Sequence, residues 1–168
     1  MVGRHSTTRR HQRQAAWMDK SSVTDNLRMW FERWADYVRR REFERAKPMF
    51  STDVVGFGTR MHVVSGLDRL ETLQWRNVWP TIRDFQFLTD EMHADVSNDG
   101  SIAWAIVPWV SVGFHEDGSA FDRPGRATVI FTPGGDPTLT PGGWQAVHTH
   151  ISLAPGTPQR SFGDPSER

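Results

Sequence analysis

The feature that most constrains the fold of this chain is a series of four long apolar stretches in its second half. They are rich in β-branched and aromatic residues. Runs of this composition favour β-strands. The segments between them consist mainly of the Asn, Asp, Gly and Pro residues that form turns. The pattern predicts an antiparallel sheet whose strands follow one another along the chain. The four stretches are residues 85–96, 102–114, 120–131 and 144–153, and the turns are 98–100, 116–118 and 133–143.

The first half of the chain begins with a helical pattern. Between residues 25 and 41 apolar residues recur every three or four positions, which predicts a long helix with one aromatic face. Asp36 and Arg40 form a favourable pair on the other face, and Thr24 or Asp25 can cap the start. The apolar positions are Leu27, Trp30, Phe31, Trp34 and Val38.

A short second helix and two short strands are expected next. The helix passes through Phe43 and must end before Pro48, because proline disfavours helical backbone in the residue that precedes it. Residues 54–57 and 61–64 have the composition of strands. These elements lead into a third helix.

The third helix is indicated by a possible capping box and by its apolar spacing. Ser65 and Asp68 stand three residues apart, as a capping box requires, and Pro80 ends the helix. Its expected apolar positions are Leu67, Leu70, Leu73, Trp75 and Val78. We therefore expect three helices before the long strands.

Helices followed by a long antiparallel sheet form an α+β plan, in which the sheet wraps its apolar face around the helices. We expect one domain at residues 23–155, with three N-terminal helices packed on a strongly curved sheet and a cavity at the open end. The basic segment 1–22 and the polar tail 156–168 have few apolar residues to offset the entropy of ordering. Both are predicted to be disordered and to add little stability.

The composition excludes several classes of function. There is no cysteine, which removes disulfides, thiolate metal sites and cysteine nucleophiles and suits a cytoplasmic location. The net charge is zero, but four arginines near the N-terminus leave sixteen basic against twenty acidic residues elsewhere. A folded domain with this excess of acidic over basic residues is not expected to bind nucleic acid. No apolar run is long enough for a membrane span, so no membrane partner is expected.

The N-terminus allows two interpretations. Its Arg-rich, acid-poor composition suits either an amphipathic transit peptide or a plain extension, and it lacks the apolar core of a secretory signal. We favour the extension, with translation starting at Met1 or at Met18.

The last apolar run has the sequence Trp144-Gln-Ala-Val-His148-Thr-His150-Ile-Ser152. This W-x-x-V-H-x-H-x-S pattern resembles the closing strand of SnoaL-like domains and of calcium/calmodulin-dependent protein kinase association domains, both in the nuclear transport factor 2-like superfamily. The turn at 50–54 and the segments 65–66 and 125–128 follow in the family's order. The resemblance implies a cone-shaped α+β domain. It leaves the activity open, because this fold hosts isomerases, cyclases, dehydratases, hydrolases and proteins without catalysis.

Ketosteroid isomerases share the first helix and the turn between Phe50 and Asp53 with this chain. The resemblance would place their catalytic tyrosine at Trp34 and their general-base aspartate at Gly58. Indole cannot replace the phenolic acid, and glycine has no proton acceptor. This mechanism is not expected, and Trp34 is interpreted as pocket wall.

The resemblance and the aromatic content together predict an apolar pocket under the sheet, because Val129 and Ile151 stand where the association domains carry basic residues. We expect it to bind a small hydrophobic molecule, up to a polycycle in size, without cofactor or metal. The protein is then a binding protein or a cyclase, isomerase or dehydratase-type enzyme. The alternative is a non-enzymatic association module. The expected wall residues are Trp30, Trp34, Tyr37, Phe57, His62, Trp75, Trp79, Trp104, Trp109, Val129, Thr149 and Ile151.

His148 and His150 stand two apart in a predicted strand, so their side chains share one face. Two imidazoles at this spacing can bind zinc, but a site needs further ligands that the sequence does not indicate. In the association domains the opposite face, here Val147, Thr149 and Ile151, looks into the pocket. We therefore expect both histidines on the outer face of the sheet.

The outer sheet face is also the expected contact between two copies of the chain. Trp144 and Ser152 have the same parity as the two histidines, and together they form an amphipathic surface that favours a homodimer. Arg126 either faces the pocket, where it could bind an anionic or carbonyl group, or lies outside with a structural role. We favour the structural role.

Overall fold

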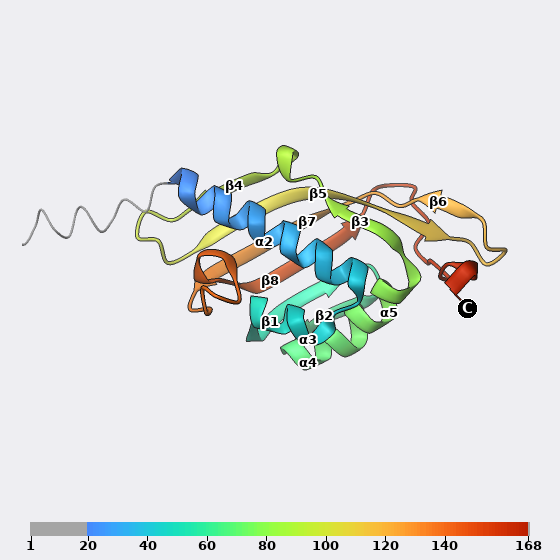
Figure 1. Ribbon diagram of the computed structural model, residues 1–168, viewed down its shortest axis with the longest axis horizontal. Coiled ribbons are helices and arrows are strands. Elements are labelled where there is room, and N and C mark those ends of the chain that lie inside the picture. Colours follow the sequence, from blue (N-terminus) through green and yellow to red (C-terminus); the bar gives the residue numbers. More distant parts are fainter. Residues whose placement is uncertain (1–19, 168) are drawn as a thin grey trace, which may run out of the picture.

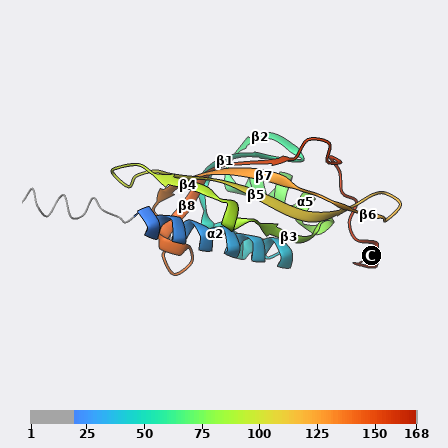
Figure 2. The same ribbon diagram turned by 90° about the horizontal axis from the view of Figure 1, so that it is seen from above.

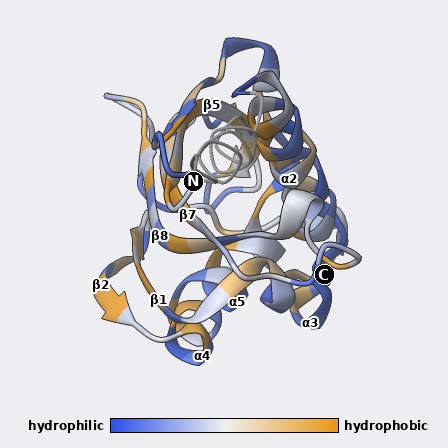
Figure 3. Ribbon diagram, turned by 90° about the vertical axis from the view of Figure 1, so that its left-hand side faces the viewer, coloured by the Kyte–Doolittle hydropathy of each residue, from blue (hydrophilic) through white to orange (hydrophobic). Residues whose placement is uncertain are grey.

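The computed structural model describes residues 20–167, in which helices cover one face of a curved eight-stranded sheet (Figure 1). Figure 2 shows the long helix α2 (Lys20–Arg40) on one side of the sheet, and Figure 3 shows the strands curling around the helices. The α+β class and the curved, cone-shaped sheet are confirmed. The strands are β1 (Phe50–Gly58), β2 (Met61–Ser65), β3 (Arg83–Phe87), β4 (His93–Val96), β5 (Ala103–Phe114), β6 (Ala120–Asp122), β7 (Gly125–Pro133) and β8 (Trp144–Leu153).

The sheet is mixed, which corrects the expectation of a purely antiparallel one. Its order is β2-β1-β8-β7-β5-β3, with β4 and β6 also paired to β5. The pair β1–β8 is parallel, with Val55 opposite His148 and Phe57 opposite His150, while the other pairs are antiparallel. Turn residues favour antiparallel pairing of consecutive strands, but β1 and β8 are joined by no turn. As expected, β8 lies inside the sheet.

Two of the predicted long runs are each divided into two strands. A short 3₁₀ turn, Thr89–Glu91, separates β3 from β4. Pro124, which has no N–H to donate, lies between β6 and β7. This break leaves Arg123 between the two strands, which matters for the pocket described below.

Helix α2 begins at Lys20, five residues earlier than predicted. The hydroxyl of Thr24 donates to the carbonyl oxygen of Lys20 at 3.0 Å, so it lies within the helix and is no cap. The predicted pair of Asp36 and Arg40 is present at 3.1 Å. Residues 1–19, which make up most of the extension expected to be disordered, lie outside the described residues. None of the described helices is both long and apolar enough to cross a membrane.

The aromatic face of α2 forms the core between helix and sheet. Trp30 is fully buried, and its ring lies 5.2 Å from Phe31, 5.4 Å from Phe50 and 4.9 Å from Phe131, in edge-to-face geometry. Such aromatic pairs each stabilise by about 0.5–1.5 kcal/mol beyond the area that they bury. They hold α2 against the concave face of the sheet.

The helices between α2 and β3 are short. Helix α3 (Phe43–Ala46) ends before Pro48, as predicted. The third helical segment contains α4 (Leu67–Leu70), a π-helical turn at Glu71–Trp75 and α5 (Arg76–Val78). Its start has no side-chain cap, because Gly66 stands at the N-cap with φ 98°.

The inner face of this segment differs from the prediction. Leu73 is exposed, whereas Glu71 and Gln74 are buried beside Trp75. A π-helical turn widens the helix and is common at functional sites. The widened turn brings two polar side chains toward the interior.

The described part of the C-terminal tail, residues 156–167, contacts the domain, and its small contribution to stability stays a prediction. The hydroxyl of Ser161 accepts from the backbone N–H of Phe114 at 2.9 Å and donates to the carbonyl of Thr81. Asp164 pairs with Arg83 at 2.5 Å. The sequence argument considered only apolar burial, but this tail is held by hydrogen bonds and an ion pair.

Candidate ligand pocket

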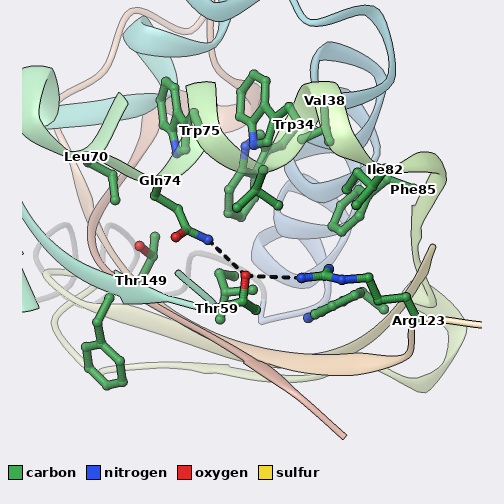
Figure 4. Close-up of a pocket in the computed structure, with 15 residues that line it drawn as sticks. Trp34, Val38, Thr59, Leu70, Gln74, Trp75, Ile82, Phe85, Arg123 and Thr149 are labelled. Carbon is green, nitrogen blue, oxygen red and sulfur yellow. Dashed lines mark hydrogen bonds between the residues drawn. The ribbon is translucent and has the colours of Figure 1, made fainter. Parts of the chain in front are cut away.

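A pocket lies between the helices and the concave face of the sheet, with side chains from both layers pointing into it (Figure 4). Its free volume is about 40 Å³. Eleven of its fifteen lining residues are apolar, and four are polar. An apolar pocket with a few polar groups is the usual form of a small-molecule site.

Seven of the expected wall residues line this pocket. They come from α2, the third helical segment and the strands β1, β5 and β8. Phe57 also packs its ring against His150 on the outer face, with 4.1 Å between the ring centroids. The seven are Trp34, Phe57, Trp75, Trp79, Trp109, Thr149 and Ile151.

The other five expected wall residues lie elsewhere. Trp30 and Val129 are fully buried in the core, and Tyr37 packs beneath the guanidinium of Arg45. His62 is exposed on β2, and Trp104 is exposed on β5. Aromatic content does not distinguish a pocket wall from a core or an outer sheet face, because all three bury apolar surface.

Eight lining residues were not expected. Five are aliphatic or aromatic and come from the helices, from strand β3 and from the residue that precedes it. Three are polar and lie close together, as Figure 4 shows. The eight are Val38, Thr59, Leu70, Gln74, Val78, Ile82, Phe85 and Arg123.

Arg123 is the charged residue of the pocket lining. Its backbone exchanges hydrogen bonds with Ser111 of β5 at 2.8 and 3.0 Å, which places it opposite a residue on the inner face of that strand. The Arg123 side chain points inward and is only 2% exposed. Its guanidinium donates to the hydroxyl oxygen of Thr59 at 3.2 Å and lies 5.4 Å from the ring of Trp109.

The positive charge of Arg123 has no carboxylate partner among residues 20–167. Burial, together with the nearby charge of Arg60, lowers its pKa to about 10, so it stays charged at neutral pH. Its Nε is buried without a hydrogen-bond partner among the described residues, as are the indole Nε1 atoms of Trp34 and Trp109. The pocket lining therefore contains donors without acceptors.

Gln74 completes the polar cluster. Its side-chain oxygen accepts from the backbone N–H of Arg60 at 3.3 Å, which turns its Nε2 toward the Thr59 hydroxyl at 3.5 Å. A Cβ atom at Gly58 would lie 2.3 Å from Gln74 Nε2, so glycine is needed for this approach. The position matched to the isomerase general base is thus packed against an amide that cannot act as a base at neutral pH.

The sequence held signals for two of these polar residues. Gln74 stands four residues from both Leu70 and Val78, which puts it on the inner face of a helix. Arg123 stands in an apolar stretch, where a charged residue is a candidate for a functional role. Arg126, for which the sequence favours a structural role, is exposed and donates to the carbonyl of Leu153 at 2.8 Å.

His148 and His150 lie on the outer side of β8, while Thr149 and Ile151 line the pocket. The Nδ1 atom of His148 is hydrogen-bonded to the carbonyl of Val55 at 2.9 Å. Burial, with the nearby charges of His148 and Arg126, lowers the pKa of His150. Within the described part of the chain, no group of three His, Cys, Asp or Glu side chains could hold a metal.

Two residues of β8 lie on the side opposite to the predicted one. Trp144 is fully buried and does not belong to the outer face, and Val147 does not line the pocket. The register shifts here, since Ile130 pairs with His148 and Phe131 with Ala146. The extra residue is a β-bulge, which reverses the alternation of side chains.

The comparison that decides the family covers most of the domain. The chain matches the SnoaL-like domain family over residues 27–156. The chain belongs to this family. No curated protein matches the chain.

Solved structures show the same fold for this SnoaL-like domain. A nuclear transport factor 2-like superfamily protein from Salmonella enterica has 18% identity and a TM-score of 0.65, covering 82% of this chain and 95% of that one. A candidate dehydratase of the same family from Streptomyces avermitilis has 17% identity and a TM-score of 0.61, covering 80% and 97%. The association domain of CaMKII from C. elegans has 12% identity and a TM-score of 0.60, covering 79% and 97%.

Proposed function

We propose that this SnoaL-like domain binds a compact hydrophobic small molecule in the pocket beneath its sheet. The observation that carries the proposal is the apolar wall formed by Trp34, Trp75, Trp79 and Trp109 around a free volume of about 40 Å³. This volume is small beside the cavity of roughly 150 Å³ that holds one benzene ring in another protein. It is too small for the polycyclic ligand considered from the sequence, and lining side chains must rotate to admit even a single ring.

Binding is favoured over catalysis by proton transfer. The fifteen described residues of the lining include no Asp, Glu, His, Lys or Tyr. A general acid or base must lie within hydrogen-bond reach of the reacting atom, and these are the residue types that usually serve. A cyclase, isomerase or dehydratase reaction here would depend on Arg123, on Thr59 or on groups of the substrate itself.

Filling the pocket tests the proposal. Ile151→Trp adds volume on the pocket side of β8, and we expect it to weaken the binding of hydrophobic probes at least tenfold. Binding is measured by calorimetry and by quenching of tryptophan fluorescence, with toluene and benzyl alcohol as first probes.

Ser152→Trp is the matched control, because Ser152 is the next residue of the strand and pairs with the outward-facing Arg126. It should bind the probes like the unmodified protein. Equal binding by both variants would place the probe site elsewhere and remove the proposal.

We also propose that the outer sheet face joins two copies of the chain. Trp104, Ile130, His148 and Val55 form one continuous row across four paired strands. Trp104 is 40% and Val55 38% exposed. A row of apolar side chains across a sheet is larger than the scattered apolar residues of ordinary surfaces. A second copy related by a two-fold axis presents the same row.

The dimer proposal is tested by placing a charge in the neighbouring row. Ile106 is exposed there beside Thr128, and Ile106→Asp should shift the protein toward monomer by at least tenfold in the dissociation constant. Sedimentation velocity measures this shift. Leu139→Asp is the control, since Leu139 is equally exposed but lies in the loop before β8. Identical sedimentation of both variants would exclude this face.

A further inference from the structure

We propose that the ligand of the pocket is an organic monocarboxylate, whose carboxylate pairs with Arg123 while its apolar body lies against the tryptophans. This inference rests on the proposed binding function and adds the chemical class of the ligand. It is carried by a buried guanidinium that the described chain leaves without a counter-charge.

The first argument is the burial of an unpaired charge. Burying a charged group is costly unless it is paired and hydrogen-bonded. Arg123 is 2% exposed, and Thr59 is the side-chain acceptor that it contacts. Arg60, the nearest source of further charge, is also positive, which raises the local affinity for an anion.

The second argument is the surplus of donors around the pocket. The Nε of Arg123 and the indole nitrogens of Trp34 and Trp109 are buried and have no hydrogen-bond partner within residues 20–167. The oxygen of Thr59 accepts from both Arg123 and Gln74, so its own hydrogen is left to donate. A ligand that supplies acceptor oxygens would satisfy these groups, and an alkane or a ligand amine would not.

The third argument separates a carboxylate from a larger or more highly charged anion. A guanidinium presents a planar fork that matches the two oxygens of a carboxylate. A phosphate ester carries up to two charges, whereas the lining offers one cation in a small apolar space. A singly charged, flat head group on a hydrophobic body therefore fits best.

The experiment compares matched acids and alcohols. The pairs are 2-methylpropanoate with 2-methylpropanol, benzoate with benzyl alcohol, and 2-naphthoate with 2-naphthylmethanol, all measured by calorimetry at pH 7.5. We expect at least one acid to bind the unmodified protein tenfold or more tightly than its alcohol. Arg123→Met should abolish that preference and leave alcohol binding within threefold.

Two further variants show whether the effect belongs to the pocket charge. Arg126→Met removes an equal charge three residues away on the exposed side, and it should keep the preference. Arg123→Lys keeps the charge but loses the planar fork, and it should keep part of the preference. Circular dichroism establishes that each variant folds.

The outcomes separate the two proposals. If the alcohols bind in a manner sensitive to Ile151→Trp but no acid is preferred, the pocket function stands and the carboxylate inference is overturned. If the preference survives Arg123→Met, the inference is also overturned. If none of the six probes binds the unmodified protein, both proposals fail together.

Discussion

Glu71 and Arg123 are both charged side chains buried in this domain, but they differ in the partners that surround their charges. Glu71 lies in the π-helical turn, where Lys47 and Arg76 approach its carboxylate at 2.7 and 2.5 Å. Arg123, between β6 and β7, meets one hydroxyl and the face of Trp109. The first charge is paired within the described chain, whereas the second has no carboxylate partner among residues 20–167.

The pKa shifts express the same contrast. Burial alone would raise the pKa of Glu71, but hydrogen bonds from Lys47 and Arg76 lower it below its ordinary value of 4.5. The pKa of Arg123 is lowered to about 10, because burial and the nearby charge of Arg60 disfavour its charge, and no carboxylate among residues 20–167 pairs with it. The charge of Glu71 therefore stabilises the fold, and the charge of Arg123 opposes it.

The largest expected effect comes from Glu71→Gln. It removes the negative charge between two cations, and we expect a loss of about 2 kcal/mol in the free energy of unfolding. This is less than the 3–5 kcal/mol typical of a broken buried pair, since Lys47 and Arg76 keep contact with water. Urea denaturation at pH 7 measures the loss.

Glu44→Gln is the control for this change, because Glu44 pairs with the same Lys47 at 3.0 Å but is exposed. Its effect on the free energy of unfolding should stay below about 0.5 kcal/mol.

The pH dependence of the free energy of unfolding gives a second test of the role of Glu71. The folded pKa of Glu71 is lowered, so its contribution is present above pH 4.5 and is lost as the pH falls below that value. The free energies of unfolding of Glu71→Gln and the unmodified protein should therefore become more similar in acid. A difference that stayed the same would contradict this assignment.

A smaller effect of opposite sign is expected from Arg123→Met without ligand. Replacing an unpaired buried charge by an apolar side chain of similar length should raise the free energy of unfolding by about 1 kcal/mol. Urea denaturation is again the measurement. Both the ordinary arginine pKa and the lower folded pKa of about 10 lie above this range, so the gain in the free energy of unfolding should stay constant from pH 5 to pH 9.

Arg126→Met serves as the control for the removal of a positive charge, because Arg126 is exposed and should change the stability by less than about 0.5 kcal/mol. A clear loss of stability in Arg123→Met would mean that Thr59 and Trp109 compensate the guanidinium fully. The contrast with Glu71 would then disappear.

The elements and the family could be predicted from the sequence to a large extent. The apolar spacing of α2, the long strands and the W-x-x-V-H-x-H-x-S pattern of β8 are local features, and local features survive folding. The pocket could be predicted only in part. Trp34, Trp75 and Trp109 line it, but Trp30 has the same residue type and spacing and lies in the core.

The outer face shows how one β-bulge changes which side chains of a strand lie on the same side of the sheet. Alternation alone assigned Trp144 to the same face as His148, but the bulge at Val147 places Trp144 in the interior. A bulge inserts one residue into a strand and depends on the pairing of that strand with its neighbours. Nothing in the residues of β8 alone indicates it.

The sequence by itself determined the α+β class, the order of the elements and the membership of the SnoaL-like family, because periodicity, turn residues and local motifs act over a few neighbouring positions. The tertiary structure decided the parallel pairing of β1 with β8, the docking of the tail and the burial of Arg123 beside Thr59. These contacts join residues that are far apart in the chain. Their geometry depends on how the sheet curls around its helices, and no local pattern carries that information.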